Sequence, residues 1–560
     1  MATWYLGLAT SGHDPALALV DETGYVRFAE ATERFVQDKR AWGIAPDHPP
    51  HLQAAMAACG VDPARDRVVV GTSWSSVKAA IDVKVHTALL PGPDTLWLRG
   101  LQAQMQESAG RSLLRLGLGA EPAGVMRFDH HLCHAVTACH FTPWADASCL
   151  VLDGEGDVGA VSCFVLEDRR LKRSWRSWGP GSLGTFYAWL TFRCGWDWRL
   201  GEEWKVMGLA AYGRAAPGLL ECLEELLTVD RGRLRFADDA AIAAIVAETA
   251  RHARAPDAPV MNAADLAATG QAAYARFADR ILEEVAKEGR TDLILTGGCA
   301  LNSSYNGTIV GNTPFERISV PPCPADDGNA IGAALLAWMK ESGAGQIPAG
   351  DTSPYLGTTP DAAAVAKCRH ASRAYKVTDV SGRSAQAVAA LLAEGRIIGV
   401  FRERAEIGPR ALGNRSILAD PRRPEMKDRI NAEVKGREPY RPFAPVVLEN
   451  DAGDWFERAQ PSPYMSLTLP WLPSVRHRVP AVVHADGTGR LQTVSEDRNP
   501  WLANVVRTFA QKTDVPVVLN TSFNIMGKPI VHTLDDALAV LTTTGLDGVL
   551  CEELLIEKPM

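Results

Sequence analysis

The sequence predicts an α/β protein whose N-terminal part contains an internal duplication and is followed by a smaller α/β domain. Three observations predict this class. Units of strand, glycine-rich turn and strand or helix recur at residues 4–20, 148–166, 292–302 and 324–339. A stretch rich in Gly, Pro, Ser and Thr near residues 342–375 then interrupts the pattern. The length of 560 residues allows two to four domains, because a domain takes about 100 to 200 residues.

Local patterns predict the elements in chain order. In WYLGLATSGHDPALALV and SCLVLDGEGDVGAVSCFVL, apolar runs on either side of a glycine turn predict paired strands. In DLILTGGCALN and PADDGNAIGAALLAWM, the glycine turn opens a helix. The other expected elements are helices over Leu219–Leu227, Ala264–Lys287, Ala385–Ala393 and Leu534–Thr542, the last capped by Thr533, strands over Ile397–Phe401 and 515–520, and a loop over 521–529.

The composition excludes several classes of protein. With 46% hydrophobic and 22% charged residues, the chain resembles an ordinary globular protein and lacks the run of about 18 apolar residues that crosses a bilayer. No basic region precedes the apolar start, so we expect no signal peptide and a cytoplasmic location. The 11 cysteines include no C-x-x-C pair, which argues against a disulfide framework or a structural zinc site. A net charge of −8 argues against bulk binding of nucleic acid.

One segment departs from this charge balance. Between Arg396 and Arg441 there are 12 Lys or Arg and 7 Asp or Glu, so the segment carries +5 and the remainder of the chain −13. Its basic residues lie in GPRALGNRS, NAEVKGRE and RPFAP, which contain Gly, Asn and Pro rather than the spacing of a solvated, salt-bridged helix. The pattern therefore favours an anion-binding pocket.

The segment DHHLCHAVTACH indicates a metal site. His130 and His134 are four residues apart, so a helix would present both imidazoles on one face, where two ring nitrogens can share a metal ion. The glycine turn that begins at Asp153 supplies a carboxylate as a third ligand. Two His with carboxylates suit zinc or iron(II). Cys133 and Cys139 are competing ligands, although Cys133 would face away from the His pair.

The glycine turns also indicate a nucleotide site, because their exposed backbone N–H groups can surround a phosphate. Four such turns in one duplicated α/β domain fit the actin/Hsp70-type ATPase architecture, which binds phosphate with two hairpins and adenosine with a later Gly-Gly pair. The chain has no G-x-x-x-x-G-K-[ST] motif, so a P-loop is excluded as the ATP site.

Nine motifs occur in the order in which one family has them: GHDPALAL, DHHLCHA, DGEGDVG, EEWKVMGLAAYG, TGGCALN, DDGNAIGAAL, GPRALGNRSILADPR, INAEVKGREPYRPFAPVVL and NTSFNIMGKPIV. In these motifs the chain resembles the O-carbamoyltransferases that include the tobramycin, cephamycin and nodulation-factor carbamoyltransferases. The resemblance implies a Kae1-like carbamoyl-transfer domain over residues 1–345, a linker over 346–375 and a YrdC-like domain over 376–560. The second domain is expected to form carbamoyl-adenylate from carbamoyl phosphate and ATP. The first is expected to transfer the carbamoyl group to a hydroxyl of a small-molecule natural product.

The resemblance also implies roles for single residues. A metal, expected to be iron with zinc as the alternative, falls on His130, His134, Asp153 and Asp326. His13 and Asp14 are candidates for accepting the acceptor's proton, and Lys39 either pairs with acceptor or phosphate or is a surface lysine. By the same resemblance, the residues expected to bind ATP, which Mg²⁺ would accompany, are Gly12, Gly154, Gly156, Asp157, Gly297, Gly298 and Asn302. The residues expected to contact carbamoyl phosphate are Arg410, Lys435, Arg441 and Arg490, with Asn520 and Ser522 as hydrogen-bond donors. Arg422, Arg423 and Arg429 are expected to lie on a solvated surface.

Other interpretations stay open at this point. The enzymatic alternatives are carbamoylation of a thiol or an amine, as in hydrogenase maturation, and threonylcarbamoylation of tRNA. The sequence lacks the zinc-finger cysteine pairs of the maturation enzyme, and its acidic N-terminal domain offers no evident tRNA-binding stripe. A nucleotide-binding regulatory protein that transfers nothing is the alternative from another class. The chain departs from the family at Asp157, where Glu is usual, at Pro15, and in LAAYG, which replaces LAPYG. The sequence determines neither the acceptor nor whether the protein is a homodimer.

Overall fold

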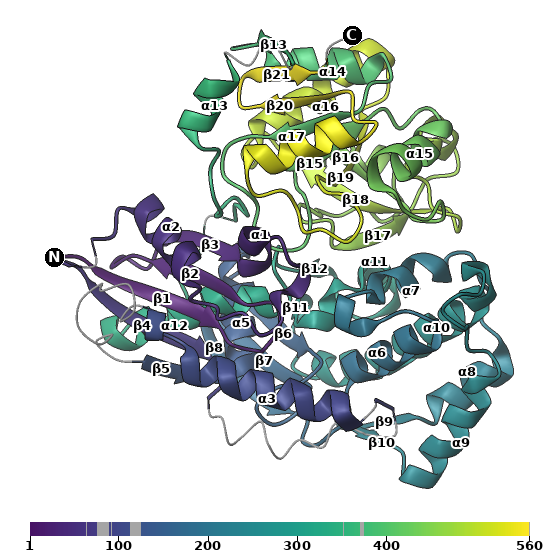
Figure 1. The fold of residues 1–560 in the computed structure, drawn as a ribbon. Coiled ribbons are helices and arrows are strands. Elements are labelled where there is room, and N and C mark those ends of the chain that lie inside the picture. Colours follow the sequence, from purple (N-terminus) through teal and green to yellow (C-terminus); the bar gives the residue numbers. More distant parts are fainter. Residues whose placement is uncertain are drawn as a thin grey trace. The chain divides into compact units, whose positions relative to one another are not determined.

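The computed structural model describes residues 1–62, 64–75, 89–90, 92–112, 125–350, 352–369 and 375–558. The chain forms two compact units (Figure 1). The first comprises Met1–Val36, Arg40–Asn302 and Ile309–Thr352, and the second comprises Gln37–Lys39, Ser303–Thr308 and Ser353–Met560. The expected linker over 346–375 includes residues 351 and 370–374, which lie outside the described residues. The assignment of transfer to residues 1–345 and of carbamoyl-adenylate formation to residues 376–560 stays a prediction.

Two five-stranded sheets in the first unit repeat one topology. In each sheet the first strand is central, the second and third strands follow on one side in antiparallel order, and two later strands add on the other side in parallel order. This repetition confirms the predicted duplicated α/β fold. One sheet has the order β3 (Val26–Ala31), β2 (Ala16–Val20), β1 (Thr3–Ala9), β4 (Arg67–Ser73) and β5 (Val125–Phe128), and the other has β12 (Arg317–Ser319), β11 (Asp292–Thr296), β6 (Ala147–Leu152), β7 (Val161–Glu167) and β8 (Arg170–Arg176).

The helices up to residue 342 join and cover these strands. They are α1 (Thr32–Val36), α2 (Pro49–Cys59), α3 (Gly92–Ser108), α5 (His130–His140), α6 (Leu183–Arg193), α7 (Glu203–Ala210), α8 (Pro217–Glu224), α9 (Asp239–Ala250), α10 (Ala264–Ala286), α11 (Ser303–Asn312) and α12 (Asn329–Ser342). The expected helix over Leu219–Leu227 is wrong at its end, because α8 stops at Glu224. Leu227 instead opens β9 (Leu227–Asp230), whose antiparallel pairing with β10 (Arg233–Phe236) buries Leu227 completely.

Helix α12 fixes the position of the turn that precedes it. It packs against β1, β2, β4 and α5, and small residues allow the close approach to the strands. A Cβ atom on Gly7 of β1 would lie 1.8 Å from the carbonyl oxygen of Ala330, and one on Gly71 of β4 would lie 2.3 Å from that of Ala333. Any larger residue in these strands would push α12 away. This packing therefore sets where the 3-10 turn Asp326–Gly328, at the start of α12, meets α5.

The second unit is built on one nine-stranded mixed sheet. Its strands in sheet order are β13 (Lys376–Asp379), β21 (Leu554–Glu557), β20 (Gly548–Cys551), β14 (Ile398–Phe401), β15 (Arg415–Ala419), β19 (Val517–Ser522), β16 (Ala444–Leu448), β18 (Thr488–Val494) and β17 (Leu467–Pro470). Its helices are α13 (Ala362–Cys368), α14 (Ser384–Ala393), α15 (Glu425–Arg429), α16 (Pro500–Thr513) and α17 (Leu534–Thr543). Thr533 caps α17 in a reciprocal capping box with Asp536, as the sequence predicts.

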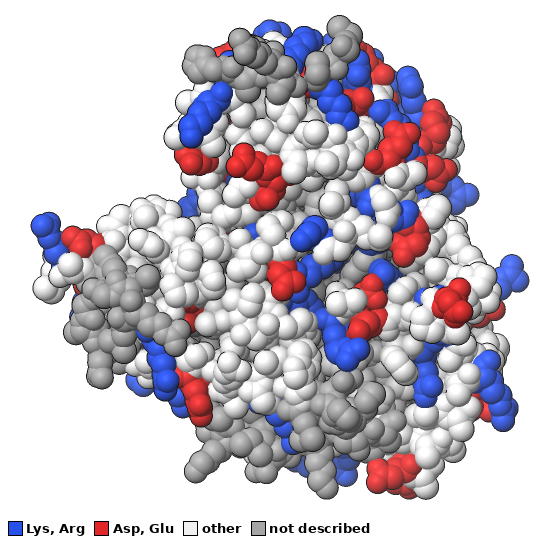
Figure 2. Space-filling model, viewed as in Figure 1, with Lys and Arg blue, Asp and Glu red and all other residues white. Residues whose placement is uncertain are grey.

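Charged side chains of both signs are interspersed on the face drawn in Figure 2. Part of the basic segment contributes nothing to such a surface, because Arg402, Arg415, Lys435 and Arg441 are each at most 7% exposed. Among the described residues, no helix combines the length and apolar character that a membrane span needs.

Candidate functional site

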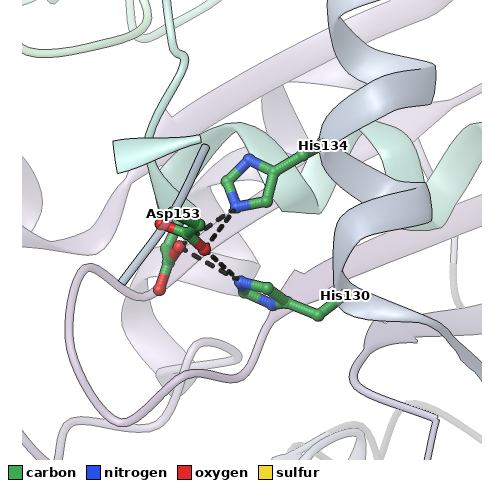
Figure 3. A group of neighbouring side chains, drawn as sticks. His130, His134 and Asp153 are labelled. Atoms are coloured by element: carbon green, nitrogen blue, oxygen red, sulfur yellow. Dashed lines mark hydrogen bonds and ion pairs between the residues drawn. The ribbon is translucent and has the colours of Figure 1, made fainter. Parts of the chain in front are cut away.

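The start of α5 presents two imidazoles in one direction. The Asp129 side chain caps the helix by accepting a hydrogen bond from the Leu132 N–H at 2.9 Å, which places His130 in the first turn. His134 follows one turn later on the same side. Both side chains are 1% exposed. In Figure 3 both rings extend from α5 toward the carboxylate of Asp153.

Asp153 follows β6 and is oriented by the glycine turn after β11. The Gly298 N–H donates to Asp153 Oδ1 at 3.0 Å, which leaves Oδ2 at 3.0 Å from His130 Nε2 and 3.3 Å from His134 Nε2. Gly297 allows this approach, since its φ is +90° and a Cβ atom there would lie 2.2 Å from the carbonyl oxygen of Leu152. The Gly-Gly pair therefore holds a carboxylate in place.

Asp326 completes the cluster from the turn before α12. Its Oδ1 lies 3.4 Å from His130 Nε2 and 3.3 Å from His134 Nε2, and one ligand atom from each of the four residues lies within 4.8 Å of the others. A tetrahedral ion with bonds of about 2.0–2.1 Å separates its ligands by about 3.3 Å, so the four residues fit a divalent metal. Asp327 lies outside the cluster and accepts a hydrogen bond from the Gly328 N–H.

The charges of this cluster favour a bound cation. Burial lowers the pKa of His130, but Asp326 and Asp153 outweigh burial and raise it to about 10. Burial raises the pKa values of the two carboxyls, yet the His130 and His134 side chains hold both well below their usual range. Two buried carboxylates side by side repel each other, and either protons on the imidazoles or a metal ion can offset that repulsion.

His13 and Asp14 lie beside this cluster, together with Arg40. His13 Nδ1 is 2.9 Å from Asp14 Oδ2 and 3.8 Å from Asp326 Oδ2, and Arg40 Nη2 donates to Asp14 Oδ2 at 3.1 Å. Arg40 and His13 hold the pKa of Asp14 below its usual value, although burial acts in the opposite direction. Arg40 Nη2 also lies 3.1 Å from His13 Nδ1, and the tautomer of His13 with its proton on Nδ1 would donate to Asp14 and present its lone pair on Nε2. Lys39 belongs to the second unit, where burial, Arg437, Arg441 and Lys39 together lower the pKa of Lys435. The expected role of Lys39 stays a prediction.

The residues expected to bind nucleotide divide into two groups. The first group consists of the five glycines that were expected in the glycine turns: Gly12, Gly154, Gly156, Gly297 and Gly298. Asp157 and Asn302 are engaged by protein partners: Asp157 accepts hydrogen bonds from Ser75 and from the His130 N–H, and the Asn302 side chain exchanges hydrogen bonds with Gln271 at 3.0 and 3.2 Å. Nucleotide contact by these seven residues stays a prediction.

In the second unit a buried carboxylate shapes the loop that carries Arg410. Glu406 is 1% exposed, and its Oε1 accepts hydrogen bonds from the N–H groups of Leu412, Asn414 and Arg415 at 2.6, 3.0 and 3.1 Å. The segment GPRALGNRS therefore folds around Glu406 and projects Arg410 from its bend.

Arg410 lies in a cluster of guanidinium groups with Arg437 and Arg490. Burial lowers the pKa of Arg410 to about 10, and burial with Arg441 lowers that of Arg437 to about 9. Burial, Arg410 and Arg437 lower the pKa of Arg490 well below its usual value. No carboxylate offsets the Arg410 and Arg490 charges among the described residues. Cations gathered in this way form a site for an anion.

Three other residues expected to contact carbamoyl phosphate are already engaged by the protein. The Lys435 ammonium is 2% exposed and donates to the carbonyl oxygen of Ser522 and to both oxygens of Asn524. The Ser522 hydroxyl donates to Asn524 Oδ1 at 2.7 Å. Asn520 donates to the carbonyl oxygen of Ala411 and to Gln492 Oε1 at 3.1 and 2.7 Å.

Asn520 thus donates to acceptors of two other segments and Ser522 to Asn524 in its own loop, and contact of either residue with carbamoyl phosphate stays a prediction. Asn520 Oδ1 is left as a buried acceptor without a partner among the described residues. Arg441, in the basic segment between Arg396 and Arg441, donates a hydrogen bond to the Glu438 carboxylate at 3.2 Å. Arg422 and Arg429, expected at a solvated surface, are half-buried and pair with Asp420 and Asp547.

Sequence reasoning missed several residues at both clusters. Arg40 and Asn329 adjoin assigned residues and could have been found as neighbours of Lys39 and of the Asp326 turn. Trp74 and Glu406 carry no sequence signal, because their contacts come from segments far away in the chain. Arg437 was counted in the basic segment but had no role assigned to it.

Comparisons with known proteins place the chain in a class of transferases. Residues 105–335 match the family model of the carbamoyltransferase N-terminus, and residues 389–558 match that of the carbamoyltransferase C-terminus. Nodulation protein NolO of Bradyrhizobium diazoefficiens is 36% identical over 77% of this chain and 79% of that protein. The 3'-hydroxymethylcephem-O-carbamoyltransferase of Amycolatopsis lactamdurans is 31% identical over 75% of this chain and 78% of that protein. The chain belongs to the carbamoyltransferase family.

A solved structure of full-length HypF in the phosphate- and nucleotide-bound form aligns with 60% of this chain and 56% of that chain, at 11% identity and a TM-score of 0.37.

Proposed function

We propose that the protein is an ATP-dependent O-carbamoyltransferase that uses carbamoyl phosphate and acts on a hydroxyl of a small molecule. Water and carbamoyl phosphate give carbamate and phosphate, and a carbamate oxygen then attacks the α-phosphorus of ATP, so that pyrophosphate leaves and carbamoyl-adenylate forms. The acceptor oxygen attacks the carbamoyl carbon, the bond to the AMP oxygen breaks, and the acceptor proton passes to the protein. The printed name of the cephem relative supports a hydroxyl as acceptor.

The cation cluster of the second unit supports the first half of this reaction. Carbamoyl phosphate is an anion and must lie beside a triphosphate, so fixed positive charge is needed to offset their repulsion. Arg410 and Arg490 are half-buried near each other without a carboxylate among their described partners, and an anion between them would remove their mutual repulsion. The buried Asn520 Oδ1, without a partner among the described residues, supports recognition of the carbamoyl N–H₂ group as a donor.

The first unit supports the second half. His13 Nε2 is the base that takes the acceptor proton, because Asp14 holds the Nδ1–H and Arg40 holds Asp14. His130, His134, Asp153 and Asp326 hold a divalent metal, which supplies a Lewis acid for the developing charge on the leaving group. Burial of these residues keeps water away from an ester-like bond that water also cleaves.

One observation carries the proposal: each unit holds one of two chemically different clusters. The test asks whether each cluster serves one of the two half-reactions. Arg490→Ala is expected to abolish carbamoyl-phosphate-dependent release of pyrophosphate. His130→Ala is expected to leave that release intact and to stop carbamoylation. Mass spectrometry across a panel of hydroxylated metabolites measures the carbamoylated product. The control is Arg423→Ala, in an exposed side chain of the same basic segment, which should change neither reaction. Equal loss of pyrophosphate release in both cluster variants would contradict the division of labour.

A further inference from the structure

The His130 ring and backbone are held by three residues from three different elements. Trp74 stacks on the ring, Asn329 contacts its second nitrogen, and Asp157 accepts from its backbone N–H. We propose that Trp74, Asn329 and Asp157 are positioning residues that hold His130 with its Nε2 directed at Asp153 and Asp326, where a divalent metal ion would bind. The proposal rests on the metal site proposed above and adds the residues that orient its first ligand.

Trp74 supports the face of the imidazole. Its ring lies 4.1 Å from that of His130 at an angle of 26°, and its indole N–H donates to Ser11 Oγ at 3.0 Å. Trp74 directly follows β4 and has a φ of +73°, a backbone conformation that is strained for a bulky residue. Such strain persists only where the surroundings require it. Here the strained backbone turns the indole, which is 3% exposed, onto His130 while its N–H reaches the loop that carries His13.

Asn329 faces the second nitrogen of the His130 ring. Its amide lies 3.3 Å from His130 Nδ1, and its Oδ1 has no hydrogen-bond partner among the described residues although the side chain is fully buried. The two ends of an amide differ only by a half-turn, which is assigned from its partners. With that half-turn, Oδ1 accepts the Nδ1–H of His130 and the buried oxygen is satisfied. Nε2, which faces Asp153 and Asp326, is then the ring nitrogen left for a metal ion.

Asp157 fixes the backbone of the same residue. Its Oδ2 accepts from the His130 N–H at 2.7 Å, and its Oδ1 accepts from the Ser75 N–H and Oγ–H at 2.8 and 2.5 Å. The carboxylate therefore joins the first turn of α5 to the residue after Trp74. Both oxygens are occupied by protein donors, which favours a positioning role for Asp157 over contact with a nucleotide.

His134 provides the contrast within the same site. Its Nδ1 is buried and has no partner among the described residues, whereas all three contacts described above converge on His130. The geometry therefore gives one ligand that is oriented in advance and one that can adjust when the metal binds. Removing the contacts to His130 should weaken metal binding even where the four ligands remain.

The test is titration of the purified, metal-free full-length protein with Co²⁺ alone, followed by the visible absorption of the bound ion. Asn329→Ala and Asp157→Asn are expected to weaken Co²⁺ binding about 10- to 100-fold, the range typical of residues that orient metal ligands. Asn329→Asp keeps an acceptor for Nδ1–H and should stay close to the wild-type affinity. Trp74→Leu should weaken binding, and Trp74→Phe, which keeps a ring, should weaken it less.

The control is Thr249→Val on α9. Thr249 is fully buried and donates to the carbonyl oxygen of Ile245 within that helix, so the variant loses a buried hydrogen bond outside the metal cluster and should lower thermal stability while keeping the Co²⁺ affinity. Wild-type affinity in Asn329→Ala, or an equal loss in Thr249→Val, would overturn the positioning role and leave the metal site standing. Failure of the wild-type protein to bind Co²⁺ would overturn both the metal site and the positioning role.

Discussion

At the scale of single residues, two arginines of the second unit have opposite surroundings. Arg415 is fully buried and donates to the carbonyl oxygens of Arg402, Asn414, Thr358 and Glu403 at 2.7–3.2 Å. Its charge is dispersed over these four acceptors, so it stabilises the fold. Arg490 is half-buried beside other cations, and burial together with Arg410 and Arg437 lowers its pKa. In the protein without ligand its charge is a cost to stability.

This contrast predicts opposite effects of the same substitution. Arg490→Met removes a half-buried charge that lies beside other cations and should raise the thermal midpoint of the free protein, by about 2–4 °C for each kcal/mol. Arg415→Met leaves four carbonyl groups without their donor and should lower stability by about 3 kcal/mol. Thermal unfolding without and with inorganic phosphate measures both effects. Phosphate at about 100 times its Kd should stabilise the wild type by about 2.7 kcal/mol and Arg490→Met not at all. A lower midpoint for Arg490→Met would contradict the anion site.

At the scale of elements, the sequence predicted those whose signal is local. The cap and spacing of α17, the strand β11 with its Gly-Gly turn, and the placement of His130 and His134 on one helix face need only neighbouring residues. The end of α8 was missed, because the apolar residues that follow it suit either a helix or the buried strand β9. Contacts between distant segments, such as Glu406 with its loop or Trp74 with His130, leave no pattern in a single sequence.

The Glu406 loop gives a prediction at this scale. Glu406→Ala removes the acceptor of three backbone N–H groups, and each hydrogen bond to a carboxylate is worth about 1.5–3 kcal/mol. We expect a loss of about 3 kcal/mol or more in the free energy of unfolding by urea and a raised KM for carbamoyl phosphate, because the loop no longer projects Arg410. Glu425→Ala at an exposed site of the same segment is the control and should change neither quantity. An unchanged KM for carbamoyl phosphate in Glu406→Ala would show that this loop does not position the substrate site.

At the scale of the whole molecule, the sequence predicted the α/β class and the internal duplication, since the glycine turns mark the repeated units. The four residues assigned to the metal lie together in the structure, and the net charge of −8 contains a segment of +5 whose cations are partly buried. The acceptor could not be predicted, because it depends on side chains that several loops bring together. Each unit holds one of the two clusters, so the two proposed half-reactions can be tested separately by experiment.

Metal removal tests that separation in the intact protein. Incubation with 2,2′-bipyridine in excess Mg²⁺ removes iron or zinc while ATP keeps its Mg²⁺, so carbamoylation should stop and carbamoyl-phosphate-dependent pyrophosphate release should continue. The physical reason is that the His and Asp cluster lies in the first unit and the arginine cluster in the second. Restoring Fe²⁺ or Zn²⁺ separately should recover carbamoylation with the ion that the site uses. Loss of pyrophosphate release in parallel with carbamoylation would show that the metal cluster does not serve the transfer step alone. Carbamoylation that survives chelation would show that the transfer step does not need the metal.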